Sequence, residues 1–255
     1  MTTLVLKITI TPVVVCLATL AGRRWGHTVS GWLVNLPVTA GPVVFFLTIE
    51  NGPQFRAAAA AGCLAGALAM TSFYVACAWG VRAARLVVGL LAGALAFFVI
   101  GGLAFRVHVR PLSLFCFAFV IVTAGLVSMP RGANQAAGAP RSAWDLPFRM
   151  AATTIIVLLL TALARELGPS LSGVLASFPV YAGTLTAFAY YSSGWQAGVA
   201  VLRGALYGLY GYAAFFFVLS ISILNFSLLV SFTAASVVAV AVHGCSLWVI
   251  TRRAG

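Results

Sequence analysis

Carboxylates are nearly absent from this chain, which has three Asp+Glu against fifteen Lys+Arg in 255 residues. Charged residues make up 7% of the chain, whereas a soluble domain carries roughly 25%. Hydrophobic residues make up 62%, and the mean hydropathy is +1.09. So few charges exclude a surface that faces water throughout, and we predict an all-α, polytopic membrane protein. The basic excess would suggest a nucleic-acid partner in a soluble protein. Here we expect none, because basic residues flank membrane spans and orient them.

The three acidic residues are also badly placed for ion exchange. Glu50 and Glu166 fall at the ends of expected spans, and Asp145 falls in a linker. Exchangers that couple cations to protons rely on ionisable groups buried at membrane depth. The sequence therefore argues against a cation–proton exchanger with a buried acidic binding residue.

Catalytic and metal-binding motifs are missing as well. There is no Walker loop, no nucleotide-binding glycine fingerprint after a strand, no H-E-x-x-H and no plausible Ser/His/Asp set. We predict no enzymatic activity, no cofactor and no metal. The five cysteines lie in apolar stretches without C-x-x-C spacing, so we interpret them as reduced small hydrophobic residues: they are Cys16, Cys63, Cys77, Cys116 and Cys245.

What the chain does contain is an internal repeat. Residues 23–46 and 165–188 align at a constant offset of 142 without a gap, and ten of the 24 positions are identical. Chance similarity between apolar segments would match Leu and Ala, but it would not keep Arg, Ser, Pro and Gly in step. After a four-residue gap the alignment resumes and pairs Tyr74 with Tyr212. We infer a duplicated unit. The identical pairs are Arg23/Arg165, Gly26/Gly168, Ser30/Ser172, Gly31/Gly173, Leu33/Leu175, Pro37/Pro179, Val38/Val180, Ala40/Ala182, Gly41/Gly183 and Phe46/Phe188.

A helix needs about 20 apolar residues to cross the hydrocarbon core, and this length predicts about nine spans. The expected architecture is two four-helix repeats, residues 1–105 and 148–255, joined by one extra helix and a polar linker within 106–147. The N-terminal run could be read as a signal peptide. Its counterpart at 149–164 lies in mid-chain, so we expect the first span to remain. The expected spans are 3–21, 29–49, 54–79, 82–105, 111–128, 147–166, 170–192, 195–222 and 226–250.

One extra span between the repeats would invert the second repeat relative to the first. With the N-terminus outside, nine basic residues fall inside and five outside, and Arg203 lies within a span. The positive-inside rule then favours an external N-terminus and an internal C-terminus. This count depends on 111–128 crossing the membrane, and it fails if that segment is re-entrant. The five outer residues are Lys7, Arg56, Arg106, Arg110 and Arg165.

Proline interrupts matching spans of the two repeats. Pro37 and Pro179 are each followed four residues later by a glycine, Gly41 and Gly183. A proline inside a helix kinks or breaks it. Secondary transporters with inverted repeats often bind substrate at such discontinuous helices near the midplane. The alternative is a pair of kinked packing helices whose small residues allow close approach.

Uncharged polar residues lie two positions either side of these prolines. Asn35 matches Ser177, and Thr39 matches Tyr181. Together with the prolines and glycines, these four residues are our candidate substrate-binding residues. They would line the site with groups that form hydrogen bonds without carrying charge.

Other polar residues lie within the spans or at their ends. Arg203 is a candidate anion contact or ion-pair partner, and the alternative is that it reaches to the nearer membrane surface. Arg23 and Arg165 each precede a glycine that can close a helix; they either interact with the helix dipole or attract anions at the mouths. Ser30 and Ser172 are expected helix caps. His243 could relay protons, but a packing role is favoured.

The stretch SGWLVNLPVTAGPVVFFLTIENG resembles a group of short, four-span bacterial inner-membrane proteins that includes GlpM and related uncharacterised families. The resemblance covers about 25 residues in each half, and it implies a tandem fusion of two such units in an inner membrane. The plan is also similar to the small drug/metabolite exporters, whose four-span units pair head to tail. Those exporters carry a mid-membrane glutamate in the first span, and residues Val13 to Leu20 offer no acid. The departure weighs against export of cationic drugs.

These observations predict a small secondary transporter or channel for a neutral polar or weakly anionic solute, with its site between the Pro37 and Pro179 segments. Arg203 would supply one asymmetric charge. The alternative is a non-transporting membrane subunit that scaffolds a partner or handles lipid. The expected partners are membrane lipid, an unidentified small solute, and either a second copy of the chain or another membrane protein.

Overall fold

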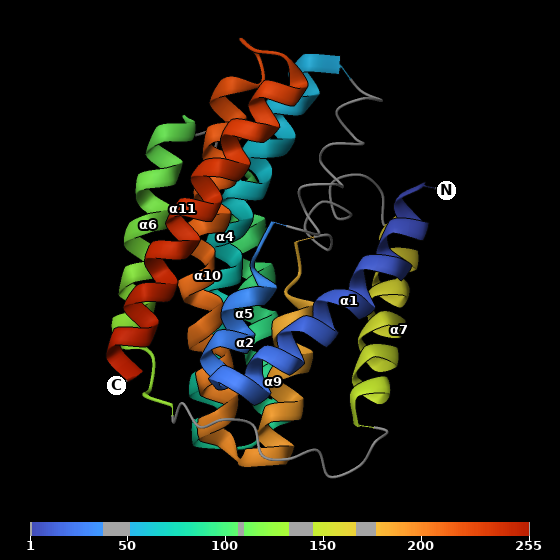
Figure 1. Cartoon of the computed structure of the whole chain (residues 1–255), viewed down its shortest axis with the longest axis vertical. Coiled ribbons are helices and arrows are strands. Elements are labelled where there is room, and N and C mark those ends of the chain that lie inside the picture. Colours follow the sequence, from blue (N-terminus) through green and yellow to red (C-terminus); the bar gives the residue numbers. More distant parts are fainter. Residues whose placement is uncertain (1, 38–51, 107–109, 133–144, 167–176, 255) are drawn as a thin grey trace.

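A computed structural model describes residues 2–37, 52–106, 110–132, 145–166 and 177–254, and these residues form helices and turns without a strand (Figure 1). The expected all-helical class is therefore confirmed. The helices are α1 (Thr2–Trp25), α2 (His27–Val34), α4 (Gly52–Ala83), α5 (Leu86–Arg106), α6 (Pro111–Ser128), α7 (Asp145–Glu166), α9 (Val180–Ser193), α10 (Trp195–Ser222) and α11 (Leu228–Ala254).

Five helices of the described chain have stretches that are long and apolar enough to cross a membrane: Gly62–Ala83, Leu86–Ala104, Pro111–Ser128, Trp195–Ser222 and Leu228–Arg252. They overlap five of the expected spans and indicate a multi-pass membrane protein. The segment on which the topology count depends, 111–128, is one continuous helix. It begins with a proline, whose missing N–H costs nothing in the first turn of a helix.

Helix α10 is the centre of the bundle. It packs against α2, α4, α6, α9 and α11, and 78% of its span is buried, compared with 17% of that of α6. Its buried side chains are mostly leucine, aromatic and small residues, including Leu202, Leu206 and Phe216. A helix that is apolar on all sides is expected at the centre of a bundle.

Helices that the repeat alignment pairs also pack against each other in the structure. Helix α1 contacts α7, and α4 contacts α10. In Figure 1, α1 descends from the N-terminus while α7 begins at the lower end of the view, so the two run in opposite directions. Helices α4 and α10 likewise begin at opposite ends.

Glycines allow α2 and α10 to touch along their backbones. A Cβ on Gly31 would collide with the carbonyl of Val201, and one on Gly204 would collide with the carbonyl of Thr28. A Cβ on Gly208 would lie 2.6 Å from the Trp32 oxygen. Small residues at membrane-helix interfaces permit this close approach. The contact fixes α2 against the centre of the bundle.

Candidate functional site

Each repeat-related proline lies in non-helical backbone. Helix α2 ends at Val34, and residues 35–37 form a turn; residues 177–179 are also non-helical, and α9 begins at Val180. The sequence left open whether these helices are kinked or broken. In the described residues, the helix is interrupted at both prolines. Pro179 is the N-cap of α9, where a missing N–H leaves no bond unmade.

The first break satisfies its own backbone. Pro37 offers no N–H to the Leu33 carbonyl, and the Leu36 N–H donates to that carbonyl instead, at 3.2 Å. The Asn35 N–H donates to the Trp32 carbonyl at 3.4 Å. These tighter i→i+3 bonds pair two of the carbonyls in the last turn of α2.

The two breaks meet around one small cavity, which we name the inter-break cavity. Its volume is about 60 Å³. Both breaks, together with α4, α9 and α10, contribute to its wall. The lining residues are Val34, Asn35, Leu36, Met70, Tyr74, Ser177, Phe178, Pro179, Tyr181, Ala182 and Tyr212.

Asn35 is the most strongly held polar group of the cavity. The residue is 4% exposed, and its Nδ2 donates to the carbonyl of Ala205 on α10 at 2.6 Å. Its Oδ1 accepts a hydrogen bond from the Tyr74 hydroxyl on α4 at 3.1 Å. A buried amide is costly unless it is paired, and here both ends of the amide are paired. Asn35 thus joins the first break to two core helices.

The second break supplies Ser177 and Tyr181. The Tyr181 hydroxyl lies 2.9 Å from Thr11 Oγ1, which links α9 to α1. A Cβ on Gly66 would lie 3.2 Å from Ser177 Oγ, so the glycine leaves room for the serine beside α4. The residues that line the cavity carry amide and hydroxyl groups and no ionic group, which suits a neutral hydrogen-bonding ligand.

Four of the predicted substrate-binding residues therefore line one cavity: Asn35, Ser177, Pro179 and Tyr181. Pro37 follows the lining residues directly in the first break and is half-buried. Gly183 lies behind the cavity, where an added Cβ would be 3.7 Å from Leu90 and from Phe73. Thr39 and Gly41 lie outside the described residues.

Two lining tyrosines, Tyr74 and Tyr212, were not predicted as site residues. They lie on α4 and α10, far in sequence from either proline. The repeat alignment did carry a signal, because it pairs these two tyrosines. A site formed symmetrically by the two aligned segments would include both tyrosines.

Arg203 is not part of the inter-break cavity. Its Nη1 donates to the carbonyls of Leu126 and Met129, at 3.2 and 3.1 Å, and more weakly to that of Pro130 at 3.5 Å. These are the carbonyls at the C-terminal end of α6, where a cation meets the negative end of the helix dipole. The aligned position in the first repeat is Ala65. Of the two aligned helices, only α10 carries the arginine, and only α10 binds the end of α6 through it.

The two arginines that precede glycines are only partly described. Arg23 is half-buried in the last turn of α1, and Gly26 follows with a φ of 93°, a backbone conformation that favours glycine. Arg165 lies near the end of α7, and its side chain is outside the described part of the structure.

The expectation that Ser30 caps a helix is wrong. The N-cap of α2 is Gly26, and Ser30 lies buried inside the helix. A Cβ on Gly22 would lie 2.9 Å from Ser30 Cβ, so the serine is a small contact residue between α1 and α2. Ser172 lies outside the described residues.

His243 packs inside the bundle. It is 2% exposed and meets the Trp32 ring edge-on, with 5.3 Å between ring centroids. Within the described part of the chain, neither ring nitrogen has a hydrogen-bond partner. A Cβ on Gly211 would collide with the imidazole. This placement favours the packing role.

The described residues contain no group of three or more His, Cys, Asp or Glu side chains that could hold a metal ion. The five cysteines are free thiols.

No protein-family model, curated protein or solved structure matches this chain. The resemblance to the GlpM-like families therefore stays a prediction. The case for a function rests on the residues and their arrangement.

Proposed function

We propose that this protein is a small secondary transporter or channel and that the inter-break cavity is its solute site. One observation carries the proposal: two helix breaks, from the two halves of a duplicated sequence, surround a single cavity with polar side chains. Broken backbone at membrane depth is tolerated where it is buried in protein or lines a watery cavity. Transporters with inverted repeats place their sites at such breaks.

The inverted arrangement of the two repeats is part of this proposal. Its support is that the paired helices α1 and α7, and α4 and α10, pack against each other and run in opposite directions in Figure 1. An external N-terminus and a cytoplasmic C-terminus in an inner membrane follow from the positive-inside count. Nine spans complete this topology.

The solute is a neutral polar or weakly anionic molecule, and the lining favours a neutral one. Asn35, Ser177, Tyr74, Tyr181 and Tyr212 are polar but uncharged, whereas Arg203 binds the end of α6 and does not line this cavity. A cavity of about 60 Å³ has room for only a few water molecules. The cavity must therefore widen during transport, and its alternating exposure to the two sides is the mechanism.

The rival function is a non-transporting membrane subunit that scaffolds a partner or handles lipid. One observation favours it: α2 and α10 are in backbone contact at Gly31 and Gly204, a geometry that suits fixed packing. Transport is compatible with this contact if the motion occurs at α9, which also lines the cavity.

Solute flux separates the two functions. Proteoliposomes containing the full chain are exposed to osmotic gradients of urea, glycerol or small polyols, and their swelling is followed by light scattering. We expect faster swelling than in empty liposomes for at least one solute. Ser177→Phe should abolish this flux by filling the cavity. Ser113→Phe, at an exposed position on α6, is the matched control and should leave it unchanged. Equal flux in the two variants would contradict the assignment of the site.

A further inference from the structure

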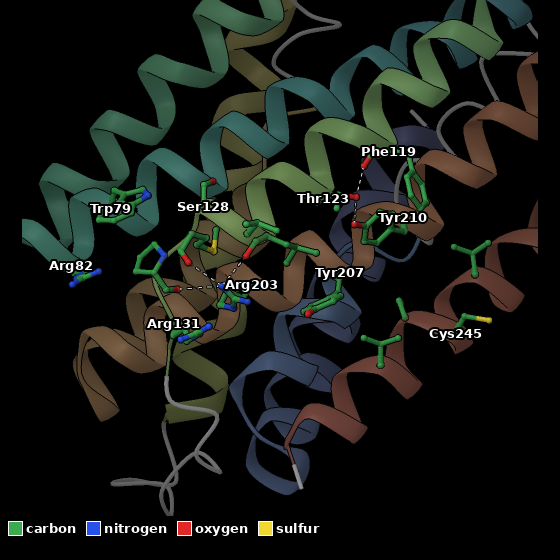
Figure 2. Close-up of a pocket in the computed structure, with 17 residues that line it drawn as sticks. Trp79, Arg82, Phe119, Thr123, Ser128, Arg131, Arg203, Tyr207, Tyr210 and Cys245 are labelled. Carbon is green, nitrogen blue, oxygen red and sulfur yellow. Dashed lines mark hydrogen bonds between the residues drawn. The ribbon is translucent and has the colours of Figure 1, made fainter.

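A second cavity, which we name the basic groove, lies between α4, α6, α10 and α11 and has a volume of about 750 Å³ (Figure 2). Its residues come from the end of α6, the last turns of α4 and the middle of α10 and α11. They are Trp79, Arg82, Phe119, Thr123, Leu126, Val127, Ser128, Met129, Pro130, Arg131, Arg203, Tyr207, Tyr210, Val242, Cys245, Ser246 and Val249.

The basic groove has two chemically different ends. Figure 2 shows Arg82, Arg131 and Arg203 gathered at one end, and Phe119, Tyr210 and Cys245 at the other. None of the lining residues is acidic. A ligand that matches both ends carries a negative group joined to a long apolar part.

The arginines are held in different ways. Arg203 is fixed by the carbonyls of α6. Arg131 is exposed, but its neighbour Gly132 lies directly on α10, because an added Cβ would be 2.6 Å from the Gln196 oxygen. The Arg82 guanidinium lies 5.3 Å from the centroid of the Trp79 ring. The lining therefore includes two exposed cations and one anchored cation, and none of the lining residues carries a carboxylate.

The length of the basic groove matches one leaflet of a bilayer. From Phe119 to Ser128, α6 rises roughly 13 Å at about 1.5 Å per residue. Half of a hydrocarbon core about 30 Å thick is roughly 15 Å. The groove as a whole is therefore about as long as the part of a lipid acyl chain that lies within one leaflet.

The basic end lies at the depth expected of lipid headgroups. Three helices end in an arginine packed on a tryptophan, as in the Arg82–Trp79 pair of α4. The guanidinium-to-ring distance is 5.6 Å for Arg24 and Trp25 in α1, and 3.9 Å for Arg252 and Trp248 in α11. Tryptophan and arginine gather at the membrane–water interface. These helix ends lie towards the lower side of Figure 1, where α6 also ends.

We propose that the basic groove binds an anionic phospholipid of the leaflet on the side where α1, α4, α6 and α11 end. The phosphate is held by Arg82, Arg131 and Arg203, and an acyl chain runs along Phe119 and Tyr210. Guanidinium groups bind phosphate oxygens through charge-assisted, often bidentate, hydrogen bonds. Basic pockets between membrane helices are known sites for anionic headgroups. The apolar end favours a lipid over free phosphate or an acidic peptide. This inference does not depend on the transport proposal.

Native mass spectrometry of the full chain in detergent tests the proposal. The protein is offered dioleoyl phosphatidylglycerol and dioleoyl phosphatidylcholine in equal amounts, and retained lipid is counted. We expect phosphatidylglycerol to be retained over phosphatidylcholine. Arg82→Gln with Arg131→Gln should lower that retention by roughly tenfold or more, because each basic residue near the surface contributes appreciably. Arg203 is left intact because it holds α6.

The matched control is Arg24→Gln with Arg85→Gln. It removes the same charge from exposed positions that the basic groove does not include, and it should leave retention unchanged. A second variant, Val242→Trp, fills the apolar part of the groove at constant charge and should also lower retention. Equal loss in both double variants, or equal retention of the two lipids by the unmodified chain, would overturn the proposal. Displacement of the lipid by millimolar inorganic phosphate, with no effect of Val242→Trp, would overturn it in favour of a small anion.

Discussion

The inter-break cavity holds about 60 Å³ and is lined by neutral groups, whereas the basic groove holds about 750 Å³ and gathers three arginines. The two cavities also differ in origin. The first is built at matching positions of the duplicated sequence. The second depends on α6, which has no counterpart in the repeat. The aligned segments thus line a small neutral cavity, and α6 supplies part of the wall of the charged one.

The largest effect is expected where the two halves differ most in packing. In Gly204→Ala the new Cβ would clash with the Thr28 carbonyl of α2. A backbone carbonyl cannot relieve the clash by changing rotamer, as a side chain could. We expect a loss of about 1–3 kcal/mol in unfolding free energy, as in other overpacked cores. Its counterpart Gly66→Ala meets Ser177 Oγ at 3.2 Å and should cost less. Denaturation by SDS, followed by tryptophan fluorescence, measures the difference.

The control for this pair is Gly102→Ala, because a Cβ there meets nothing within 4 Å. It should be neutral or slightly stabilising. If Gly66→Ala and Gly204→Ala were equally harmful, the two halves would be packed alike, and the contrast between them would fail.

Arg203→Met should disable the basic groove and spare the inter-break cavity. It leaves the terminal carbonyls of α6 without their donor, and bonds to a charged group contribute roughly 1.5–3 kcal/mol. We expect faster hydrogen exchange in the last turn of α6 and reduced retention of phosphatidylglycerol, with solute flux maintained. Arg203→Lys should restore part of the protection.

If Arg203→Met lost solute flux while α6 stayed protected from hydrogen exchange, the arginine would act in the transport site. The two cavities would then not be functionally separate. Arg85→Met, at an exposed position on the same side of the molecule, controls for charge alone.

A smaller effect is expected at the polar wall of the inter-break cavity. Asn35→Leu removes the bonds to Ala205 and Tyr74, and Tyr74→Phe removes the second bond alone. Hydrogen bonds between membrane helices contribute at most about 1–2 kcal/mol each. A double-mutant cycle on unfolding free energy should therefore show coupling between the two substitutions. Strict additivity would mean that the Asn35–Tyr74 bond contributes nothing.

The smallest effect is expected for Tyr181→Phe, which removes the single bond to Thr11 between α9 and α1. The loss should be about 0.6 kcal/mol, the average for such bonds in a membrane. Thr11→Val should give the same loss in an SDS titration, and the double variant should lose no more than either single one. A loss of unfolding free energy several times larger would mean that Tyr181 stabilises the fold through contacts other than this bond.

Much of the fold could be predicted because apolar length and proline position are local signals. The segment 111–128 was predicted with the bounds of α6, and 195–222 with those of α10. Pro37 and Pro179 predicted interruptions, and breaks occur at both. Asn35, Ser177 and Tyr181 were predicted as lining residues because the repeat placed them beside the prolines.

The remainder depends on tertiary contacts that leave little trace in the sequence. Arg203 pairs with backbone carbonyls, which every residue carries, so no motif could name its partner. Ser30 was expected to cap a helix, but the positive φ of Gly26 starts α2 four residues earlier. Tyr74 reaches Asn35 from α4, and only the spatial arrangement brings them together.

The most direct test of the central claim is the accessibility of the inter-break cavity to water. Single cysteines are placed at Ser177 or Tyr181 in a variant that lacks the five native cysteines, in oriented vesicles. Membrane-impermeant thiol reagents are added from each side. Leu95→Cys, 68% exposed on the apolar face of α5, is the lipid-facing control, and Arg85→Cys is the water-facing one. We expect labelling at 177 and 181 from both sides, faster than at 95. No labelling at either position, with Arg85→Cys fully labelled, would show a dry, fixed bundle and contradict it.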